Sequence, residues 1–596
     1  MAKKYTMLKT GSKLAISNDK LKTHFEKHFA ARSLPMPPEL EKPEDYPHLT
    51  DEVIAVNEDV PDSEETNKVL KSFKNGKSRG TDIKTEGLKY NSSQNLLMAI
   101  VALLTLIWTI VIVPSVWLHC KITCLYKKGL TSLASNYRGL SIGANMSRIL
   151  AKIIMNRLKD AYEHHISEEQ YGFRQNRSTA DGIFIIKNVL DRFGGTIIAV
   201  YIDLTAAYDH VPRDFLFRLL KMRTGAHHLM AILQKMYEGT TASIKGTKAV
   251  FDVLIGCRQG GQESPCLFNY YFDYVLKVAA HEIDKKYPNG WGLPFNFNIP
   301  HWCTNREQRR KGKMNGIDVI KWILYADDVV LFCKSVQEAE DLLNIINNTC
   351  NRFGLTISFK KTKTQIFNNA DLAETESLFK IGNEAIENVQ QFTYLGQVIS
   401  NSKNTCFTEY RTARAIAKFN ELRNILTDRV VNMRTRKKLL ESCVRSRLTY
   451  GTQAWLPNEK QMKKLKICWL QCLRSMVKGG WRRKYIPDSS DEEDGDIEAD
   501  YSYVYSNQRI QEIVGTQPLA KFINSQYLKY IGHVCRAENS RLTKKILFAK
   551  PTKTFFRDPW LKIARLLGTT TDEAKRITQS REKFAELVRK STNPPP

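Results

Sequence analysis

The sequence lacks a disulfide framework and a secretory leader. Its 12 cysteines are scattered over 596 residues without the regular spacing of a stapled secreted domain, and residues 1–4, Met-Ala-Lys-Lys, begin no hydrophobic segment. We therefore expect reduced thiols and an intracellular location, in the nucleus and cytoplasm. Cys120/Cys124 and Cys468/Cys472 are closely spaced, but neither has a second Cys or His pair at zinc-site spacing. Both pairs are predicted to be structural thiols.

Long hydrophobic runs are scarce, and one exception needs an explanation. Residues 96–118 contain no charged residue and are long enough to span a bilayer. However, Pro114 interrupts this run, and a strand-like pattern follows at residues 121–128. We expect a buried helix without membrane contact, with a membrane span as the alternative.

Acidic residues are few relative to basic ones. The chain has 62 Asp+Glu against 90 Lys+Arg, a net charge of +28. Such an excess attracts polyanions because binding releases their condensed counterions, so nucleic acid is the leading candidate partner. A soluble basic protein without such a partner is the alternative, since net charge does not determine function. The length predicts several domains.

Two β-prone hydrophobic runs meet at a pair of adjacent acids. In residues 322–332 they are joined by Tyr325-Ala326-Asp327-Asp328, which predicts a hairpin with carboxylates at its tip. Carboxylates held at a tight turn suit Mg²⁺ or Mn²⁺, and Mg²⁺ takes one or two protein carboxylates together with substrate phosphates. An ordinary hairpin with an acidic turn is the alternative, because a short motif only raises a hypothesis.

Other candidate residues lie at strand ends and in glycine-containing loops. Asp203 ends a predicted buried strand at 196–204. Residues 170–179 hold Arg174 and Arg177 beside glycine and aromatic residues, as in a loop that approaches a phosphate backbone, although a solvated loop is the alternative. Residues 256–265 form a glycine-rich turn before a predicted helix, a weak signal for binding a phosphate or a base edge. Arg258 in this turn is a further candidate for nucleic-acid contact.

The rest of the sequence mixes helix, strand and loop patterns. It predicts an amphipathic helix at 146–163, a loop or insertion at 285–313, a lysine-containing strand at 354–366, a strand pair centred on 392–398, basic helices at 408–476 and an acidic disordered segment from 489 to 500. A solvated helix face is the usual reading of such basic helices.

Taken in order, these motifs resemble the reverse transcriptases of non-LTR retrotransposons, the LINE-like elements. That family has a fingers loop, an aspartate at a strand end followed by an aromatic residue, a Gln-Gly turn, the Tyr-Ala-Asp-Asp hairpin, a lysine strand and a Leu-Gly strand pair. All six occur here in order, from Asn136 to Gly396. Residues 530–534, Tyr-Ile-Gly-His-Val, resemble a segment that these elements often carry after the thumb. The series is specific, although each motif alone is weak evidence.

The resemblance implies an α+β fold, a right-hand polymerase whose palm is an antiparallel sheet, followed by a helical basic C-terminal region. The expected divisions are an N-terminal lead-in at 1–70, fingers at 71–195, a palm at 196–400 with an inserted loop at about 285–313, a helical thumb at 401–484, an acidic disordered linker at 485–505 and the C-terminal helical region at 506–596.

The resemblance also implies catalytic residues. Asp203, Asp327 and Asp328 match the acids that hold two divalent ions. Lys361 matches the lysine proposed to protonate pyrophosphate. Tyr208 matches the aromatic gate that excludes a 2′-hydroxyl by steric clash.

Further residues match the family's nucleotide contacts. Gln259 and Gly260 match the turn that packs on nucleotide and template, and Arg138 stands where the family has a fingers residue near the triphosphate. One departure is Gly261-Gln262-Glu263 before Ser264, where the family has a hydrophobic residue, so template contact is expected to differ there. Roughly seventy residues precede the first fingers segment, too few for an endonuclease domain, so target nicking is not expected from this chain.

The resulting hypothesis is an RNA-directed DNA polymerase that extends a DNA primer on an RNA template with deoxynucleoside triphosphates. A decayed or domesticated nucleic-acid-binding copy is the alternative, which the intact Asp203, Asp327 and Asp328 disfavour. An RNA-copying RNA polymerase is disfavoured by Tyr208, since such an enzyme needs room for the 2′-hydroxyl. The sequence does not indicate an oligomeric state.

Overall fold

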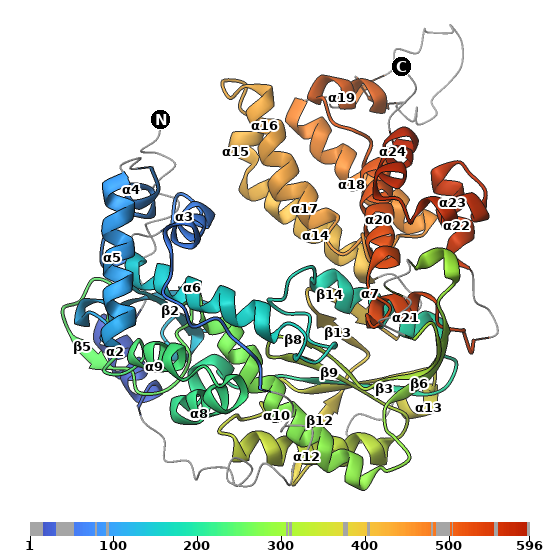
Figure 1. The fold of residues 1–596 in the computed structure, drawn as a ribbon. Coiled ribbons are helices and arrows are strands. Elements are labelled where there is room, and N and C mark those ends of the chain that lie inside the picture. The colour runs from blue at the N-terminus through green and yellow to red at the C-terminus, as the bar shows by residue number, and fades with distance from the viewer. Residues whose placement is uncertain are drawn as a thin grey trace, which may run out of the picture.

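The structure is a computed structural model with a U-shaped outline (Figure 1). One arm carries helices from the N-terminal part of the chain, the other carries helices from the C-terminal part, and sheets form the base. The residues described are 16–30, 53–77, 80–90, 94–304, 308, 313–373, 379–401, 406–477, 481–483, 501–503, 505–553 and 558–592.

The base contains a six-stranded sheet in the order β11-β12-β10-β3-β9-β8. All neighbours are antiparallel except β10 and β12, which are parallel. The mixture of helices with a largely antiparallel sheet agrees with the predicted α+β class. The strands are β3 (Ile197–Ile202), β8 (Trp322–Tyr325), β9 (Asp328–Cys333), β10 (Lys363–Phe367), β11 (Phe379–Ile381) and β12 (Glu384–Asn388).

Both faces of this sheet are covered. One face packs with α10 (Ser264–Lys286) and α12 (Val336–Arg352) in the largest hydrophobic core. The other face packs with α7 (Thr179–Arg192) and with helices near the C-terminus. All six residues of β3 are therefore buried, as expected for a continuous hydrophobic run in a central strand.

A second, four-stranded sheet has the order β2-β1-β4-β5. It combines strands from both sides of the expected boundary at residue 195, and α2 (Asn18–His28) packs on it in a separate small core. The strands are β1 (His119–Tyr126), β2 (Tyr137–Ile142), β4 (Thr241–Ile244) and β5 (Val250–Asp252).

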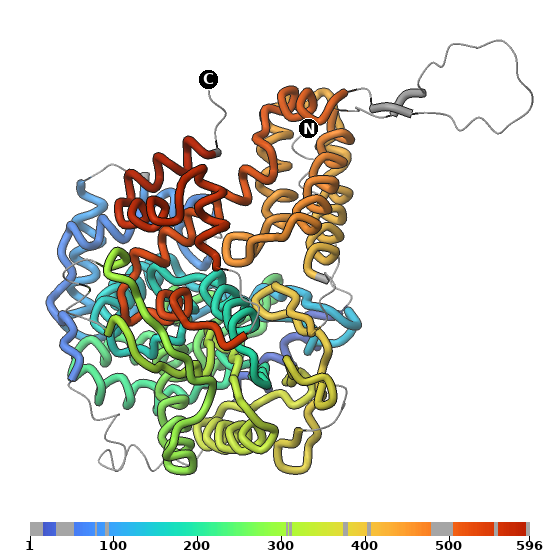
Figure 2. The backbone as a smooth tube through the Cα atoms, turned by 90° about the vertical axis from the view of Figure 1, so that its right-hand side faces the viewer, coloured from blue at the N-terminus to red at the C-terminus, as the bar shows by residue number. Residues whose placement is uncertain are grey.

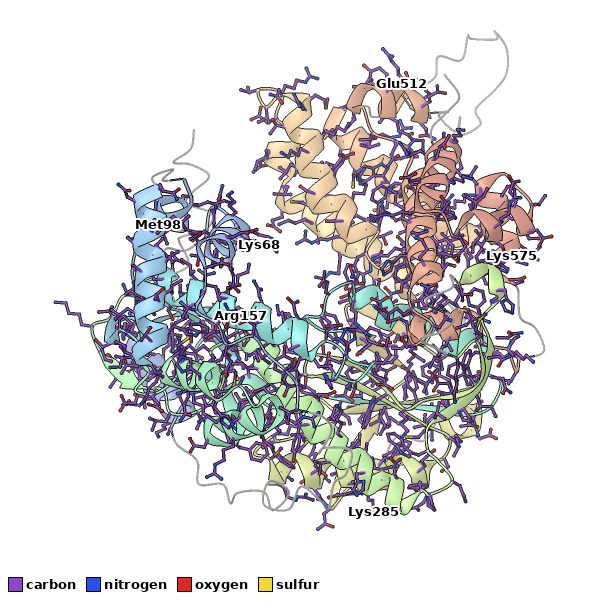
Figure 3. All side chains as sticks on the ribbon, in the orientation of Figure 1. Lys68, Met98, Arg157, Lys285, Glu512 and Lys575 are labelled. Carbon is purple, nitrogen blue, oxygen red and sulfur yellow. The ribbon has the colours of Figure 1, made fainter. Side chains whose placement is uncertain are left out.

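The long hydrophobic run is only partly helical and only partly buried, which corrects the prediction of a buried helix. Helix α5 (Gln94–Ile110) ends before Pro114, and only one side of it, including Leu104 and Trp108, is buried. Met98 and Leu106 on its other side are about half exposed; Met98 is labelled in Figure 3. Among the described helices, none combines the length and hydrophobicity needed to cross a membrane.

The predicted loop at 285–313 contains a strand, which is a second correction. Strand β6 (Leu293–Asn298) pairs antiparallel with β7 (Asn315–Ile320). Leu293, Phe295 and Phe297 are buried and alternate with exposed residues, the period-2 pattern of a strand with one covered face. The Pro and Asn residues between them hid this alternation.

The predicted lysine strand at 354–366 is shorter than expected, whereas the next strand pair is confirmed. Residues 359–361 form a turn before β10. β13 (Gln391–Tyr394) and β14 (Gln397–Ser400) form a separate antiparallel pair.

The second arm is built from α14 (Cys406–Glu421), α15 (Arg423–Leu426), α16 (Met433–Leu440), α17 (Ser446–Leu448) and α18 (Glu459–Val477). They share a core with α19 (Asn507–Val514) and the start of α20 (Leu519–Arg536). The basic helical pattern predicted for 408–476 is thus confirmed. Figure 2 shows this helical column beside the last helices of the chain, with both above the sheets.

The C-terminal helices belong to two cores. The start of α20 packs in the second arm, and the rest of α20 with the following helices packs on the six-stranded sheet. Those helices are α21 (Leu542–Leu547), α22 (Pro559–Leu567), α23 (Thr571–Ile577) and α24 (Arg581–Thr592). The acidic segment 489–500 lies outside the described residues. At the end of the linker expected for 485–505, β16 (Tyr501–Tyr503) pairs with β15 (Trp481–Arg483).

The remaining elements connect these units. They are α3 (Ser63–Ser72), α4 (Thr85–Tyr90), α6 (Asn145–Tyr162), α8 (Arg213–Thr224), α9 (His227–Lys235), α13 (Ala370–Ala373), the 3₁₀ turns η4 (Ser115–Trp117), η5 (Ala134–Asn136), η6 (Ala207–His210) and η7 (His301–Cys303), and the π-turn η8 (Glu441–Arg445).

Candidate active site

The acidic hairpin is confirmed, and its turn is clamped from behind. Tyr325 pairs with Asp328 across a turn in which the buried Ala326 has φ 56°. The buried Gln170 side chain accepts the Ala326 N–H at 2.9 Å and donates to the Ala326 carbonyl at 3.3 Å. A Cβ on Gly172 would lie 2.4 Å from the Ala326 nitrogen. The hairpin tip is therefore positioned by the 170–172 loop.

Asp203 stands at the end of β3, and the segment before β10 holds it there. The Ser358 N–H donates to the Asp203 carbonyl at 2.8 Å. This pairing also places Lys361 in front of the carboxylate, where Lys361 Nζ donates to Asp203 Oδ1 at 2.8 Å. Since β3 and β9 are neighbours, Asp203 reaches the same end of the sheet as the hairpin turn.

Negative charge is concentrated at this end of the sheet. Burial and the negative charge of Asp203 raise the pKa of Asp327, while Arg138 and Lys361 partly offset the rise. Asp328 is accessible to solvent, yet the surrounding protein and the charges of Asp327 and Asp203 raise its pKa to about 6. A cation bound here would relieve this repulsion.

Three cations surround the acids. Arg138 on β2 and Lys361 were predicted from the sequence, whereas Lys127 was not. Burial and the positive charges of Arg138 and Lys361 lower the pKa of Lys127, and Asp209 and Asp203 oppose the change. Lys127 directly follows β1, whose Leu125 pairs with Arg138, so strand pairing brings the two cations together. The three cations suit a polyphosphate bound beside the carboxylates.

Tyr208 faces the carboxylates from η6. Its ring stacks on Phe268 with centroids 4.5 Å apart. Burial and the nearby charge of Asp327 raise the pKa of the phenol, which keeps it neutral. Its carbonyl accepts the Cys257 N–H at 2.7 Å, which links η6 to the Gln-Gly turn.

The Gln-Gly turn is fastened at two points. The side-chain Nε2 of Gln259 donates to Asp209 Oδ2 at 3.0 Å. The backbone carbonyl of Gln259 accepts the Ser141 N–H at 2.8 Å. Gly260 has φ 105°, a left-handed conformation, and a Cβ there would lie 2.9 Å from the Ser141 carbonyl oxygen. Glycine is therefore required where the turn crosses the end of β2.

Arg174 and Arg177 are not exposed to nucleic acid, which corrects their predicted role. Their side chains are 4% and 5% exposed. Arg174 pairs with Glu163 at 2.9 Å and Arg177 with Glu168 at 2.7 Å. Both guanidinium groups thus hold the 163–177 loop together, and pairing with internal carboxylates is the usual condition for burying arginine.

Arg258 also has internal partners. Its guanidinium donates to the Met236 carbonyl and lies 4.6 Å from the centre of the Tyr237 ring. These contacts fasten the start of the Gln-Gly turn to the end of α9. These contacts of Arg258 are structural, and its contact with nucleic acid stays a prediction.

A pocket of about 750 Å³ lies beside the hairpin, between α3, α6, the 163–175 loop and α10. Lys68 and Arg157, labelled in Figure 3, belong to its wall. Phe173 on its edge is half exposed, has φ 58°, and lies 6.4 Å from Tyr325 between ring centroids. Such a conformation in a bulky residue marks a local constraint.

The donor set fits a divalent cation in its chemistry. Carboxylate oxygens are the ligands that Mg²⁺ and Mn²⁺ prefer, and one or two are enough. In the described ranges no three His, Cys, Asp or Glu side chains are grouped closely enough to coordinate one ion, and Asp203 pairs with Lys361 instead. Cys120, Cys124, Cys468 and Cys472 are free thiols.

The central segment of the chain is similar to known proteins. Residues 125–399 match the family model for reverse transcriptase (RNA-dependent DNA polymerase). The chain is 23% identical to a probable RNA-directed DNA polymerase from transposon BS of Drosophila melanogaster, over 57% of this chain and 36% of that protein. It is 22% identical to a retrovirus-related Pol polyprotein from the type-1 retrotransposable element R2 of Popillia japonica, over 51% and 40%.

A third relative has a comparable level of identity. A putative COX1/OXI3 intron 1 protein of Saccharomyces cerevisiae is 24% identical over 38% of this chain and 28% of that protein. This chain therefore spans between about a quarter and two fifths of the length of these three relatives. All the carboxylates and cations of the candidate site lie within the matched range 125–399.

Proposed function

We propose that this chain, whose residues 125–399 match the reverse transcriptase family model, is the RNA-directed DNA polymerase of a non-LTR retrotransposon. The reaction is nucleotidyl transfer from a deoxynucleoside triphosphate to a DNA primer paired with an RNA template. The observation that carries the proposal is the placement of Asp203, Asp327 and Asp328 at one end of the sheet, where burial and the repulsion between these acids raise the pKa of Asp327 and of Asp328.

Asp203 and Asp327, with Asp328 beside them, are the residues that would hold Mg²⁺ or Mn²⁺. Bound divalent ions would supply activation of the primer 3′-hydroxyl and neutralisation of the charge on the leaving pyrophosphate. The chain itself contributes the rigid placement of these acids, through the end of β3 and the clamp of Gln170 on Ala326.

The cations and Tyr208 form the nucleotide site. Lys127, Arg138 and Lys361 lie near the carboxylates and would pair with the triphosphate, because each carries positively charged N–H donors that phosphate oxygens accept. Lys361 is also the candidate proton donor to the leaving pyrophosphate. Tyr208, held by Phe268, would exclude a 2′-hydroxyl by steric clash.

The nucleic acid would lie between the two arms of the U, with fingers at 71–195, palm at 196–400 and thumb at 401–484. Exposed basic residues on or beside the helices of the second arm support this path, because phosphate contacts supply most of the affinity for nucleic acid. They are Arg414, Arg423, Arg429, Arg434 and Lys438. Arg411 and Arg436 are buried and donate to backbone carbonyls. An intracellular location, in the nucleus and cytoplasm, is part of the proposal.

The test is primer extension by the chain on an RNA template with a DNA primer, deoxynucleotides and Mg²⁺. The control is the Asp327→Ala, Asp328→Ala double variant, assayed beside the wild type after both show cooperative thermal unfolding and the same primer–template affinity. Extension by the wild type alone is expected. Equal yields from the two proteins would leave only nucleic-acid binding, the function of a decayed or domesticated copy.

A further inference from the structure

Helix α2 was expected to belong to a simple lead-in, yet it is docked on the four-stranded sheet. Leu21 and Phe25 are buried and share a core with Ile122, Tyr137 and other residues of that sheet. A Cβ on Gly139 of β2 would lie 2.8 Å from the Phe25 ring. The helix is thus packed directly behind the strand that carries Arg138.

The last turn of α2 reaches the nucleotide site. His28 Nε2 lies 3.0 Å from Asp209 Oδ2, the same oxygen that accepts from Gln259 Nε2 at 3.0 Å. A carboxylate only accepts hydrogen bonds, so the ring nitrogen carries the proton and His28 is the donor. The ring is held in place by Phe29 and His210, whose centroids lie 5.1 and 5.4 Å away.

Asp209 depends on these two donors. The residue is 8% exposed, and its Oδ1 is buried without a hydrogen-bond partner inside the described part of the chain. Among the described residues, His28 therefore supplies one of two side-chain hydrogen bonds that stabilise this buried carboxylate. Removing one donor from such a group weakens the position of the whole side chain.

Gln259 in turn depends on Asp209. A glutamine amide has an NH₂ side that donates and a carbonyl side that accepts. Because the NH₂ side is bound to Asp209, the Oε1 side is turned away from it. A change in Asp209 would let the amide rotate and would alter the group that it presents to a nucleotide.

From this chain of contacts we infer that His28 is a positioning residue of the nucleotide site, which acts through Asp209 to orient the Gln259 amide. Helix α2 is then part of the polymerase site, although it lies almost a hundred residues before the matched segment (97 positions, 125 − 28). This inference rests on the proposed function, because it needs a nucleotide to be bound beside Gln259.

The test compares His28→Ala, His28→Gln and Thr23→Ala with the wild type in primer extension with varied deoxynucleotide. Thr23 is an exposed residue of the same helix whose hydroxyl donates to the Asp19 carbonyl, and it serves as the matched control. His28→Ala is expected to raise KM for the deoxynucleotide roughly three- to tenfold with kcat within about twofold. Because a glutamine amide nitrogen can replace Nε2 as donor, His28→Gln is expected to restore KM.

Primer–template affinity and the thermal unfolding midpoint are also measured for each variant. A purely structural role of α2 would change these two quantities, whereas a positioning role would change the KM for the deoxynucleotide alone. Should His28→Ala fail to fold, Asp209→Asn carries the test, because it keeps the side-chain size and removes the fixed acceptor. An unchanged KM, or an equal rise in Thr23→Ala, would overturn the inference while the wild type still extends primers. A wild type without extension would overturn the proposed function instead, and the inference with it.

Discussion

Lys361 Nζ lies 2.8 Å from Asp203 Oδ1, so a carboxylate proposed to hold a divalent ion is paired with a cation of the chain itself. The pair is open to solvent, with side chains 61% and 37% exposed, so it is weak and easily exchanged. The ammonium group and an incoming metal ion therefore compete for the same oxygen.

Replacing Lys361 is predicted to separate metal affinity from turnover. Lys361→Met is expected to lower the Mg²⁺ concentration for half-maximal extension by about two- to fivefold, because the competing charge is removed. At saturating Mg²⁺, kcat is expected to fall by roughly tenfold or more, since a proton donor is lost. Lys360→Met on the adjacent exposed lysine is the control. An unchanged Mg²⁺ concentration for half-maximal extension in Lys361→Met would show that Lys361 does not compete with the metal for Asp203.

The raised pKa of Asp328 predicts a pH-dependent cost to the metal-free fold. A carboxyl whose pKa is raised to about 6 in the folded protein binds its proton more tightly there than in the unfolded chain. The ionisation of Asp328 therefore destabilises the fold. This destabilisation is complete above a pH of about 6 and absent below a pH of about 4, where the carboxyl is protonated in both the folded and the unfolded chain. In EDTA, Asp328→Asn is expected to raise the unfolding midpoint by about 1–2 °C at pH 7.5 and to have little effect at pH 4.

Asp252→Asn, which changes an exposed acid on β5, is the control for this experiment. Thermal unfolding across the pH range should give a difference between wild type and Asp328→Asn that shrinks as the pH falls through about 6. A difference that stays constant with pH would contradict the assigned environment of Asp328.

The main features of the site could be predicted because they depend on local sequence. Two β-prone hydrophobic runs joined by Tyr325-Ala326-Asp327-Asp328 specify a hairpin, and a continuous hydrophobic run that ends at Asp203 specifies a buried strand with its acid at the end. Their meeting in space was implied by the family resemblance, and β3 does pair with β9.

The features that were missed depend on contacts between distant segments. Lys127 joins the site only because β1 pairs with β2, and His28 only because α2 docks on that sheet. Arg174 and Arg177 have the composition of a phosphate-binding loop, but nearby glutamates bind them. In sequence, an arginine that will be buried against a carboxylate looks the same as one that will face a phosphate.

Tyr208 is predicted to select against ribonucleotides through its ring. Tyr208→Ala is expected to raise the incorporation of ribonucleotides relative to deoxynucleotides on the order of tenfold or more, because space opens for the 2′-hydroxyl. Tyr208→Phe keeps the ring that stacks on Phe268 and should retain the selectivity of the wild type. The ratio of kcat/KM for the two nucleotides is the measurement. Equal ratios in wild type and Tyr208→Ala would remove Tyr208 from the gate.

Gly172 is predicted to control the position of Asp327 without touching it. A Cβ at Gly172 would lie 2.4 Å from the Ala326 nitrogen and 3.0 Å from Gln170 Oε1, so Gly172→Ala must push the turn and its clamp apart. A displacement of about 1 Å at reacting groups costs on the order of a hundredfold in rate, and kcat is expected to fall by that factor with KM for the primer–template little changed. Gly195→Ala is the matched control, because a Cβ there meets nothing within 4 Å. Single-turnover extension by the two variants measures the difference directly, and equal rates would mean that the hairpin is not held by the 170–172 loop.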